Sequence, residues 1–446
     1  MTESVELAWS GHAPSRPGPG GVGTRLVAWP PKANLPRLLN LPLSICLIVL
    51  VFLTQSAVAA TQGQTREHSL SPEAQELVQR ALAGLDPAVP LVDYHVHIVG
   101  NGKGPNGIEV NQSMLSNRHP LKRMIANLYI GASGASDTER FDEEYEERLV
   151  QLARGFHHPI KLHILAFDHH YNPNGTINHE KSEFYVPNEY VVRLSERHPD
   201  IFVPVISIHP YRTDSLSELE KWAAKGVRYV KWLPNAQGID PRDERCDAFY
   251  RRMRELGMIL IAHTGEEKAV SSGGAQSLGN PLLYRRALDS GLTIIMAHCA
   301  SLGWGDDLDH PGKKAPNFDL FMRLMGEEKY RGQLFGDISA ITQFNRMSRP
   351  VRELLRRPDI HARLVNGSDY PLPAMNAVIW TSQIAALGMI TFSERKALNE
   401  IYQVNPLLFD FALKRTLHDP KTGQRFAPAL FLENRSLKKL AADLGG

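Results

Sequence analysis

The stretch LVDYHVHIVG, residues 91–100, places two histidines one residue apart at the end of an apolar run. The run predicts a β-strand, in which successive side chains alternate between two faces. One face would carry Asp93, His95 and His97, and the other Val92, Tyr94 and Val96. Two imidazoles on one face can hold a metal ion, although His-X-His also occurs by chance. The interpretation therefore depends on further ligands at matching places.

Seven more apolar runs follow, and longer amphipathic stretches separate them. This alternation of apolar and amphipathic segments predicts a parallel α/β protein. The expected strands are 91–97, 161–167, 202–208, 227–233, 258–263, 292–298, 333–339 and 362–369. The expected helices are 188–198, 215–224, 243–256, 281–289, 317–328, 347–357 and 376–386. Eight such units predict a (β/α)8 TIM barrel, with its reactive groups at the carboxyl ends of the strands.

A doubly wound open sheet is the competing fold. It would be expected to carry a glycine-rich phosphate loop after an early strand, and the strand-to-helix turns of this sequence contain none. The first connection of the barrel, residues 98–155, is unusually long and predicts helices at 119–130 and 139–155. Loops of that length commonly cover a site or shape its specificity.

The N-terminal sixty residues differ in composition from the rest. Residues 1–37 are rich in Gly and Pro and predict a mobile leader. Residues 38–60 hold an apolar run behind basic residues and end in a small-X-small pattern, which is the order of a secretory signal peptide. Retention as a single membrane anchor is the alternative, because the run is near the lower limit for a bilayer span. Either way we expect the barrel domain, 61–446, to be exported to the periplasm or the cell exterior.

Charge and cysteine content exclude some classes of function. The formal net charge is +2, and residues 1–60 supply it with four basic and two acidic side chains, so the remainder is neutral. No clustered basic footprint for nucleic acid is apparent. Of the three cysteines, Cys46 lies in the apolar run, and the spacing of Cys246 and Cys299 does not argue for a disulfide. Cys299 is expected to be a small buried thiol.

Polar residues capable of metal chemistry stand at the ends of several predicted strands. They are His95 and His97 on the first, Lys231 near the end of the fourth, His263 on the fifth, His298 on the sixth and Asp369 on the eighth. Alternation places Tyr229 and Leu233 on the face of Lys231, Ile259 and Ile261 on the face of His263, and Ile294 and Met296 on the face of His298. Because carboxyl ends of barrel strands meet at one rim, this set predicts a metal site there.

Imidazole and carboxylate ligands suit a divalent ion, with zinc first and manganese or iron as alternatives. Such an ion lowers the pKa of a bound water towards neutrality and polarises a substrate carbonyl. A carboxylate in the position of Asp369 can touch the ion, take the proton of the water and pass it to a leaving group.

This arrangement resembles the amidohydrolase superfamily of metal-dependent barrel hydrolases. The segments VKWLPNAQGIDP, AHTGE, MAHCAS, NGSDYPLP and NPLLFDFAL are similar to its amidohydrolase-related branch, which contains hydrolases, lactonases and decarboxylases of aromatic acids. The resemblance covers roughly residues 88–415. It is specific for the superfamily and leaves the substrate open.

The resemblance implies roles for the strand-end residues. His95, His97, His263 and Asp369 would be metal ligands, and Asp369 would also be a catalytic base. His298 would bind a second ion or act on the substrate beside a single ion. Lys231 would bridge two ions if carboxylated, or remain a plain cation near the site.

Other residues near strand ends are weaker candidates. His209 after the third strand is a candidate for substrate binding, and Asp168 and His169 after the second could also face the pocket. Glu266 and Glu267 are as consistent with solvated loop charges as with hydrogen-bond partners of a ligand.

The sequence therefore predicts a metal-dependent hydrolase that uses metal-activated water on an amide, lactone or ester bond of a small molecule. One alternative is a metal-dependent, non-oxidative decarboxylase of an aromatic or unsaturated carboxylic acid. Another is a non-catalytic secreted binding protein on the same barrel. The substrate and the oligomeric state are left open by the sequence.

Overall fold

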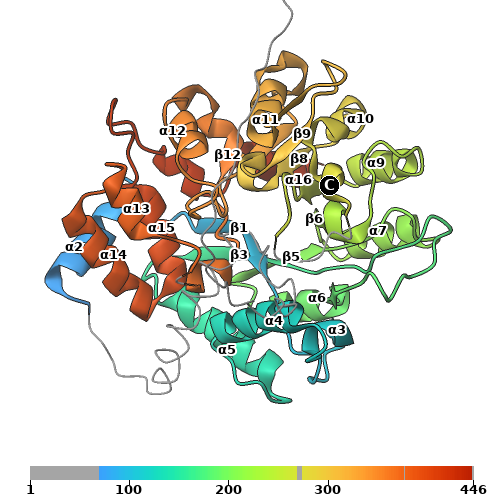
Figure 1. The fold of residues 1–446 in the computed structure, drawn as a ribbon, viewed down its shortest axis with the longest axis horizontal. Coiled ribbons are helices and arrows are strands. Elements are labelled where there is room, and N and C mark those ends of the chain that lie inside the picture. The colour runs from blue at the N-terminus through green and yellow to red at the C-terminus, as the bar shows by residue number, and fades with distance from the viewer. Residues whose placement is uncertain (1–69, 269–273, 376, 444–446) are drawn as a thin grey trace, which may run out of the picture. The chain divides into compact units, whose positions relative to one another are not determined.

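The computed structural model describes residues 70–268, 274–375 and 377–443. Its main sheet has eight parallel strands, paired in chain order and surrounded by helices (Figure 1). They are β1 (Leu91–His97), β3 (Ile160–Leu165), β5 (Phe202–Ile206), β6 (Tyr229–Trp232), β7 (Ile259–Ala262), β8 (Ile294–Met296), β11 (Leu334–Asp337) and β12 (Leu364–Val365). Each overlaps one strand expected from the sequence.

The sheet closes on itself where the segment after β12 meets β1. The backbone N–H of Tyr94 donates to the carbonyl of Asn366 at 2.9 Å, and that of His97 donates to the carbonyl of Tyr370 at 2.9 Å. In return, the N–H of Asp369 donates to the carbonyl of His95 at 2.8 Å. The predicted (β/α)8 TIM barrel is therefore confirmed.

The interior of the barrel is filled by apolar side chains from all eight strands. Since side chains alternate along a strand, each strand contributes one or two of them, and the rest pack outward against the helices. This interior cluster consists of Val92, Tyr94, Leu165, Val205, Tyr229, Ile259, Ile261, Ile295, Phe335 and Val365, with Leu437 of α16 (Arg435–Asp443) added. Leu437 extends the cluster beyond the strands.

The outer layer contains the helices expected between the strands. They are α6 (Asn188–Arg197), α7 (Ser215–Ala224), α9 (Cys246–Glu255), α10 (Arg285–Asp289), α11 (Asn317–Gly326) and α12 (Arg349–Leu355). The short helix α8 (Pro234–Gln237), after β6, was not predicted. After the last strand come α13 (Thr381–Ala386), α14 (Phe392–Val404) and α15 (Pro406–Thr416). In α6, Tyr190, Val191 and Leu194 are buried, which is the spacing of one helical face against the barrel.

The first connection is folded, as expected from its length. It carries β2 (Glu109–Val110), α3 (Gln112–Leu115), α4 (Pro120–Ser133) and α5 (Phe141–Arg154). Proline opens α4, and Gly134 ends it with a left-handed φ of 74°, a conformation that glycine adopts without strain. Strand β2 pairs antiparallel with β4 (Phe184–Tyr185), so this connection is joined to the one after β3. A separate hairpin pairs β9 (Trp304–Asp306) with β10 (Lys314–Pro316).

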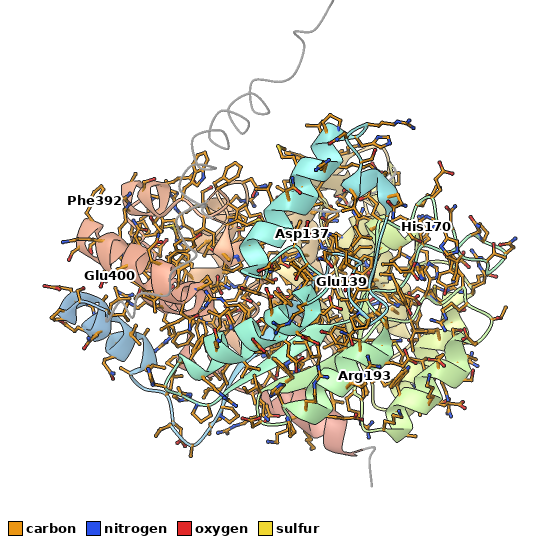
Figure 2. All side chains as sticks on the ribbon, turned by 90° about the horizontal axis from the view of Figure 1, so that it is seen from below. Asp137, Glu139, His170, Arg193, Phe392 and Glu400 are labelled. Atoms are coloured by element: carbon orange, nitrogen blue, oxygen red, sulfur yellow. The ribbon has the colours of Figure 1, made fainter. Side chains whose placement is uncertain are left out.

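The described chain begins beside its last helices. Ser71 is the N-cap of α2 (Pro72–Leu82), and its hydroxyl donates to a carboxylate oxygen of Glu400 on α14 at 2.7 Å. Figure 2 shows Glu400 on the side of α14 that faces α2. This contact anchors the first described helix to the end of the barrel domain.

The predicted leader over 1–37 and the signal or anchor segment over 38–60 lie outside the described residues. No helix within the three described ranges is long and apolar enough to cross a membrane. Cys246 and Cys299 are both buried and carry free thiols, so the buried thiol expected at position 299 is confirmed.

Candidate metal centre

Strand β1 presents both of its histidines to the rim of the barrel because it contains a bulge. Its register against β3 shifts between Asp93 and Val96. Tyr94, which lies within this shift, belongs to the interior cluster, so the prediction that Tyr94 faces away from the histidines is wrong. An extra residue in one strand resets the alternation, which lets Tyr94 and His95 both turn inward.

Asp93 holds this bulge in place. One of its carboxylate oxygens accepts hydrogen bonds from the N–H of His95 at 3.0 Å and from the N–H of Ser368 at 2.8 Å. The side chain thus bonds the bulged strand to the segment that follows β12. Burial raises the pKa of Asp93 to about 7, against the opposing effect of these hydrogen bonds.

Three donor atoms at the rim have the spacing of metal ligands. Nε2 of His95 and Nε2 of His97 are 3.3 Å apart, and Oδ1 of Asp369 lies 3.5 Å from the first and 3.2 Å from the second. Ligand atoms of a tetrahedral zinc ion, with bonds of about 2.0–2.1 Å, lie roughly 3.3 Å apart. We call His95, His97 and Asp369 the rim trio; its residues fit a zinc-sized ion.

The backbone supports the position of Asp369. Its φ of 61° is in the left-handed region, which is uncommon for residues other than glycine, Asn and Asp. Its N–H bonds the carbonyl of His95, so the same two residues meet through backbone and side chain. Within the rim trio, the side chain of His97 is 25% exposed and that of His95 is fully buried, so the trio is open on the His97 side.

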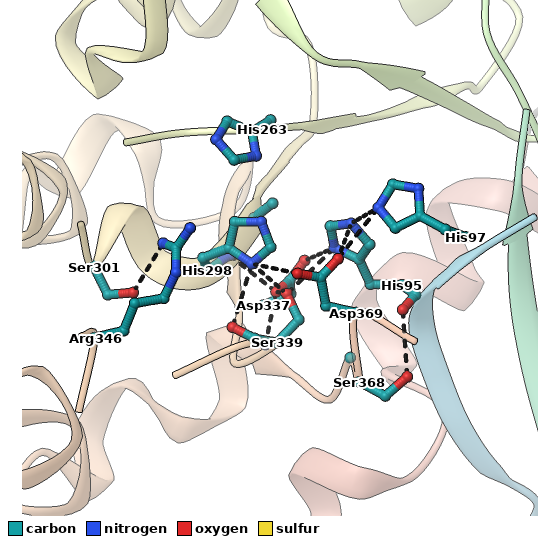
Figure 3. Close-up of polar contacts among 12 residues, drawn as sticks. His95, His97, His263, His298, Ser301, Asp337, Ser339, Arg346, Ser368 and Asp369 are labelled. Atoms are coloured by element: carbon teal, nitrogen blue, oxygen red, sulfur yellow. Dashed lines mark hydrogen bonds and ion pairs between the residues drawn. The ribbon is translucent and has the colours of Figure 1, made fainter. Parts of the chain in front are cut away.

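Asp337, at the end of β11, orients His95. Its Oδ2 accepts a hydrogen bond from Nδ1 of His95 at 2.9 Å (Figure 3). The lone pair of His95 is then on Nε2, the nitrogen that faces His97 and Asp369. Its Oδ1 accepts from the N–H groups of His298 and Ser339 at 3.0 and 2.8 Å. Burial opposes ionisation of Asp337, but His95 and these donors hold its pKa well below the usual range.

Lys231 lies inside the barrel, 1% exposed, with Nζ 3.0 Å from Nε2 of His95. It shares its face with Tyr229 of the interior cluster, as alternation predicted. The same prediction is wrong for Leu233, which packs in the other core cluster because β6 ends at Trp232 and Leu233 is already the N-cap of α8. Burial lowers the pKa of Lys231 to about 8, while the carboxylates of Asp337, Asp369 and Glu267 oppose this shift.

His263 follows β7, whose Ile259 and Ile261 face the interior as predicted. Its Nδ1 is 3.4 Å from a carboxylate oxygen of Glu267, and its buried Nε2 has no hydrogen-bond partner among the described residues. Burial lowers the pKa of His263 well below its ordinary value. A neutral imidazole with an unpartnered nitrogen at this rim is a further donor for an ion.

His298 reaches the rim by a route that the sequence did not reveal. Strand β8 ends at Met296, and both Met296 and Ile294 pack outside the barrel while Ile295 faces inward, so the predicted facing is wrong. The backbone then turns sharply, with φ of 58° at His298 and 47° at Cys299.

This turn delivers the ring of His298 to its neighbours. Nδ1 is 2.8 Å from the hydroxyl of Ser339 and 4.0 Å from Oδ2 of Asp369. Burial lowers the pKa of His298 to about 3.

The structure keeps the weaker candidates away from this rim. Both ring nitrogens of His209 bond the chain itself, one to the carbonyl of Gln237 at 3.0 Å and one to the N–H of Tyr211 at 3.1 Å. Asp168 accepts hydrogen bonds from the N–H of His209 and from Arg212. His169 stacks on the ring of Tyr185, with centroids 4.0 Å apart. Of the two glutamates, Glu267 is the one that contacts a predicted ligand.

A cavity of about 290 Å³ opens above these residues. Its walls come mainly from the first connection and from the loops after β11 and β12, and they are largely apolar. The members that carry chemistry are His97, His263, His298 and Asp369, joined by Tyr129, Glu267, Gln343 and Arg346. The long first connection therefore covers the site, as its length indicated.

Sequence reasoning missed two contributors. Asp337 ends the seventh strand just as the predicted ligands end theirs, so asking what closes every strand would have found it. Arg346 is 6% exposed and lies in the loop after β11, with Nη1 3.5 Å from the hydroxyl of Ser301. No spacing in the sequence marks it, because its position depends on the path of an irregular loop.

Comparisons with known proteins find a matching family model and distantly similar solved structures. A family model described as amidohydrolase matches residues 92–379. Among solved structures, an uncharacterised TIM-barrel protein from Bordetella bronchiseptica is 15% identical, with a TM-score of 0.44 over 69% of this chain and 95% of that one. A search of curated proteins finds no match.

Two further structures have names that state an activity. The 4-oxalomesaconate hydratase from Rhodopseudomonas palustris is 15% identical, with a TM-score of 0.37 over 80% of this chain and 94% of that one. The 5-carboxyvanillate decarboxylase from Novosphingobium aromaticivorans, with bound manganese, is 11% identical, with a TM-score of 0.39 over 70% and 95%. Likeness at this level carries no information about the reaction.

Proposed function

The chain belongs to the amidohydrolase family, and from this premise we propose that it is a metal-dependent hydrolase of an amide, lactone or ester bond in a small molecule. The observation that carries the proposal is the spacing of the rim trio, whose donor atoms lie 3.2–3.5 Å apart as they would around one zinc-sized ion. The cavity above the trio has room for a small substrate.

We propose that one divalent ion, with zinc first, is held by the rim trio. The unpartnered Nε2 of His263, which does not lie within 4.8 Å of all three donors, completes the ligand set by a small movement when the ion binds. The hydrogen bond from His95 to Asp337 fixes the tautomer that such binding needs. A bound ion of this kind would supply an activated water and polarise the bond to be cleaved. In this proposal Lys231 stays uncarboxylated. Its ammonium group near His95 repels cations and so disfavours a second divalent ion beside the trio.

The chain's own residues divide the proton transfers. Asp369, ionised and at the rim, accepts the proton of the attacking water and later returns it to the leaving group. His298 has Nδ1 turned to Ser339 and, as a neutral imidazole, positions the substrate. The apolar walls exclude bulk water from the bond being cleaved.

The first experiment is metal content per chain, measured by plasma mass spectrometry on protein purified without chelators and with bicarbonate present. About one ion per chain is expected. Two ions would instead support a carboxylated Lys231 bridge with His298 as a ligand. No binding after addition of zinc or manganese would overturn the metal centre.

The second experiment tests the role of Asp369 with a panel of esters, lactones and amides. Hydrolysis is measured by the acid that is released. Asp369→Asn should lower kcat by roughly 10²- to 10⁴-fold at saturating zinc, because it removes the proton acceptor. The matched control is Asp359→Asn, whose carboxylate is 59% exposed and which should leave kcat unchanged. Undiminished turnover in Asp369→Asn would contradict the role assigned to Asp369. Release of carbon dioxide from a carboxylic acid would support decarboxylation as the reaction instead of hydrolysis.

A further inference from the structure

Arg346 is a buried cation without a buried anion in contact. It lies in the loop after β11, lines the cavity and is 6% exposed. Its Nη1 is 3.5 Å from the hydroxyl of Ser301, at the limit of a hydrogen bond, and its buried Nε has no partner. Across residues 70–268, 274–375 and 377–443, no carboxylate oxygen is found within 4.0 Å of this guanidinium.

Such an arrangement is costly unless something completes it. A guanidinium carries five donors in a planar fork, and burying its charge without pairing costs several kcal/mol. The nearest acidic groups, Asp369 and Glu267, act on Arg346 through space rather than through contact. A divalent ion at the rim trio would offset the negative charge of Asp369. The positive charge of Arg346 would then be less balanced by its surroundings than in the metal-free protein.

The position of Arg346 places this charge at one end of the metal centre. Figure 3 shows Arg346 beside Ser301, on the far side of His298 from His95 and His97. Around it the cavity is apolar, with Ile125, Leu128, Phe344, Met375 and Val378 among its lining residues. Lys268 also lines the cavity, but its side chain is 63% exposed and pairs with Glu266. The space therefore offers one buried cationic contact beside a largely hydrophobic wall.

We propose that Arg346 is an anion-binding subsite, and that the substrate is an amphipathic acid whose carboxylate pairs with Arg346 while its apolar body fills the cavity. A planar carboxylate matches the fork of the guanidinium in a bidentate contact. The proposal rests on the proposed function, because the bond to be cleaved must then lie between this carboxylate and the rim trio.

The test uses zinc-loaded protein and two probes of similar size, benzenesulfonate and methyl phenyl sulfone, with binding measured by calorimetry. A sulfonate is a weak ligand for zinc. Tighter binding of the sulfonate than of the neutral sulfone therefore reports on the guanidinium of Arg346 rather than on the zinc ion. Wild-type protein should bind the sulfonate more tightly, and Arg346→Met should reduce that preference about 10- to 100-fold.

Two further variants separate charge from structure. Arg346→Lys should retain part of the preference for the sulfonate. Arg349→Met removes an exposed arginine three residues away, whose side chain is 59% exposed, and should leave the preference unchanged. An anion preference that survives in Arg346→Met would overturn the proposal, and so would failure of wild-type protein to bind the sulfonate at millimolar concentration.

The subsite and the hydrolase fail in distinguishable ways. Hydrolysis of neutral esters as fast as of their anionic counterparts would overturn the subsite and leave the hydrolase intact. Sulfonate binding that depends on Arg346, in a protein that hydrolyses nothing on the panel, would retain the subsite and remove the hydrolase.

Discussion

At the scale of single residues, His163 on β3 ties the stability of the barrel to pH. It is 4% exposed and stacks on Tyr94, with ring centroids 4.4 Å apart. Burial lowers the pKa of His163 from 6.5 to about 3. Between these values the unfolded chain binds a proton that the folded chain does not, so stability is full above pH 6.5 and declines as the pH falls.

We therefore expect His163→Phe, which keeps an aromatic ring, to flatten this dependence. From pH 7 to pH 5 the metal-free wild-type protein should lose about 2 kcal/mol more unfolding free energy than the variant. Urea denaturation at both pH values measures the difference. His119→Gln, at an exposed histidine, should behave as wild type, and equal losses in wild type and His163→Phe would contradict the prediction.

Side-chain facings on regular strands were predictable, and facings on irregular backbone were not. Lys231 and His263 follow strand geometry, so alternation placed Tyr229, Ile259 and Ile261 correctly beside them. The predicted side-chain directions were wrong at Tyr94, where β1 has a bulge, and at His298, where the backbone makes a left-handed turn. Such features depend on hydrogen bonds from distant segments, as from Asp93 to Ser368, which periodicity does not contain.

At the scale of elements, the bulge of β1 is the feature on which the metal centre depends. Asp93 alone accepts both the N–H of His95 and the N–H of Ser368. Asp93→Ala leaves two buried N–H groups without this acceptor, so we expect the free energy of unfolding to fall by about 1–3 kcal/mol. Zinc affinity, measured by competition with a chelator, should fall about 10- to 100-fold, the usual effect of losing a group that orients a ligand.

Asp93→Asn is the matched variant for this prediction. Its amide oxygen can still accept both hydrogen bonds, and it resembles the protonated form that burial favours. It should therefore keep zinc affinity within a few-fold of wild type. Wild-type zinc affinity in Asp93→Ala would show that the bulge does not need this side chain.

The eight strands were predictable because each is an apolar run long enough to stand out from its flanks. The β2–β4 pair and the β9–β10 hairpin were not, because strands of two or three residues carry too little periodicity. Helix α16 was also missed: its contribution to the interior, Leu437, becomes visible only when the barrel has closed around it.

At the scale of the whole molecule, the rim trio joins the two edges of the sheet that must meet for the barrel to close. His95 and His97 belong to β1, and Asp369 follows β12. An ion held by all three binds the closed barrel and not the open chain, so it stabilises the fold by mass action.

We expect zinc at about 1,000 times its dissociation constant to add about 4 kcal/mol to the unfolding free energy and to raise Tm by several degrees. Differential scanning calorimetry of metal-free and zinc-loaded protein measures the shift. In Asp369→Ala, which lacks one of the three donors, the shift should shrink sharply. A Tm that is independent of zinc in the wild-type protein would mean that the ion does not bridge the two edges.

The wide separation of these donors along the sequence also governs when an ion can be acquired. A chain emerging from the ribosome presents His95 and His97 early, but Asp369 appears only when most of the protein has been made. The complete set of donors then exists only after the first and last strands have paired. The protein is thus expected to take its metal from the compartment in which folding finishes, so that the ions available there, rather than those present during translation, decide which one it carries.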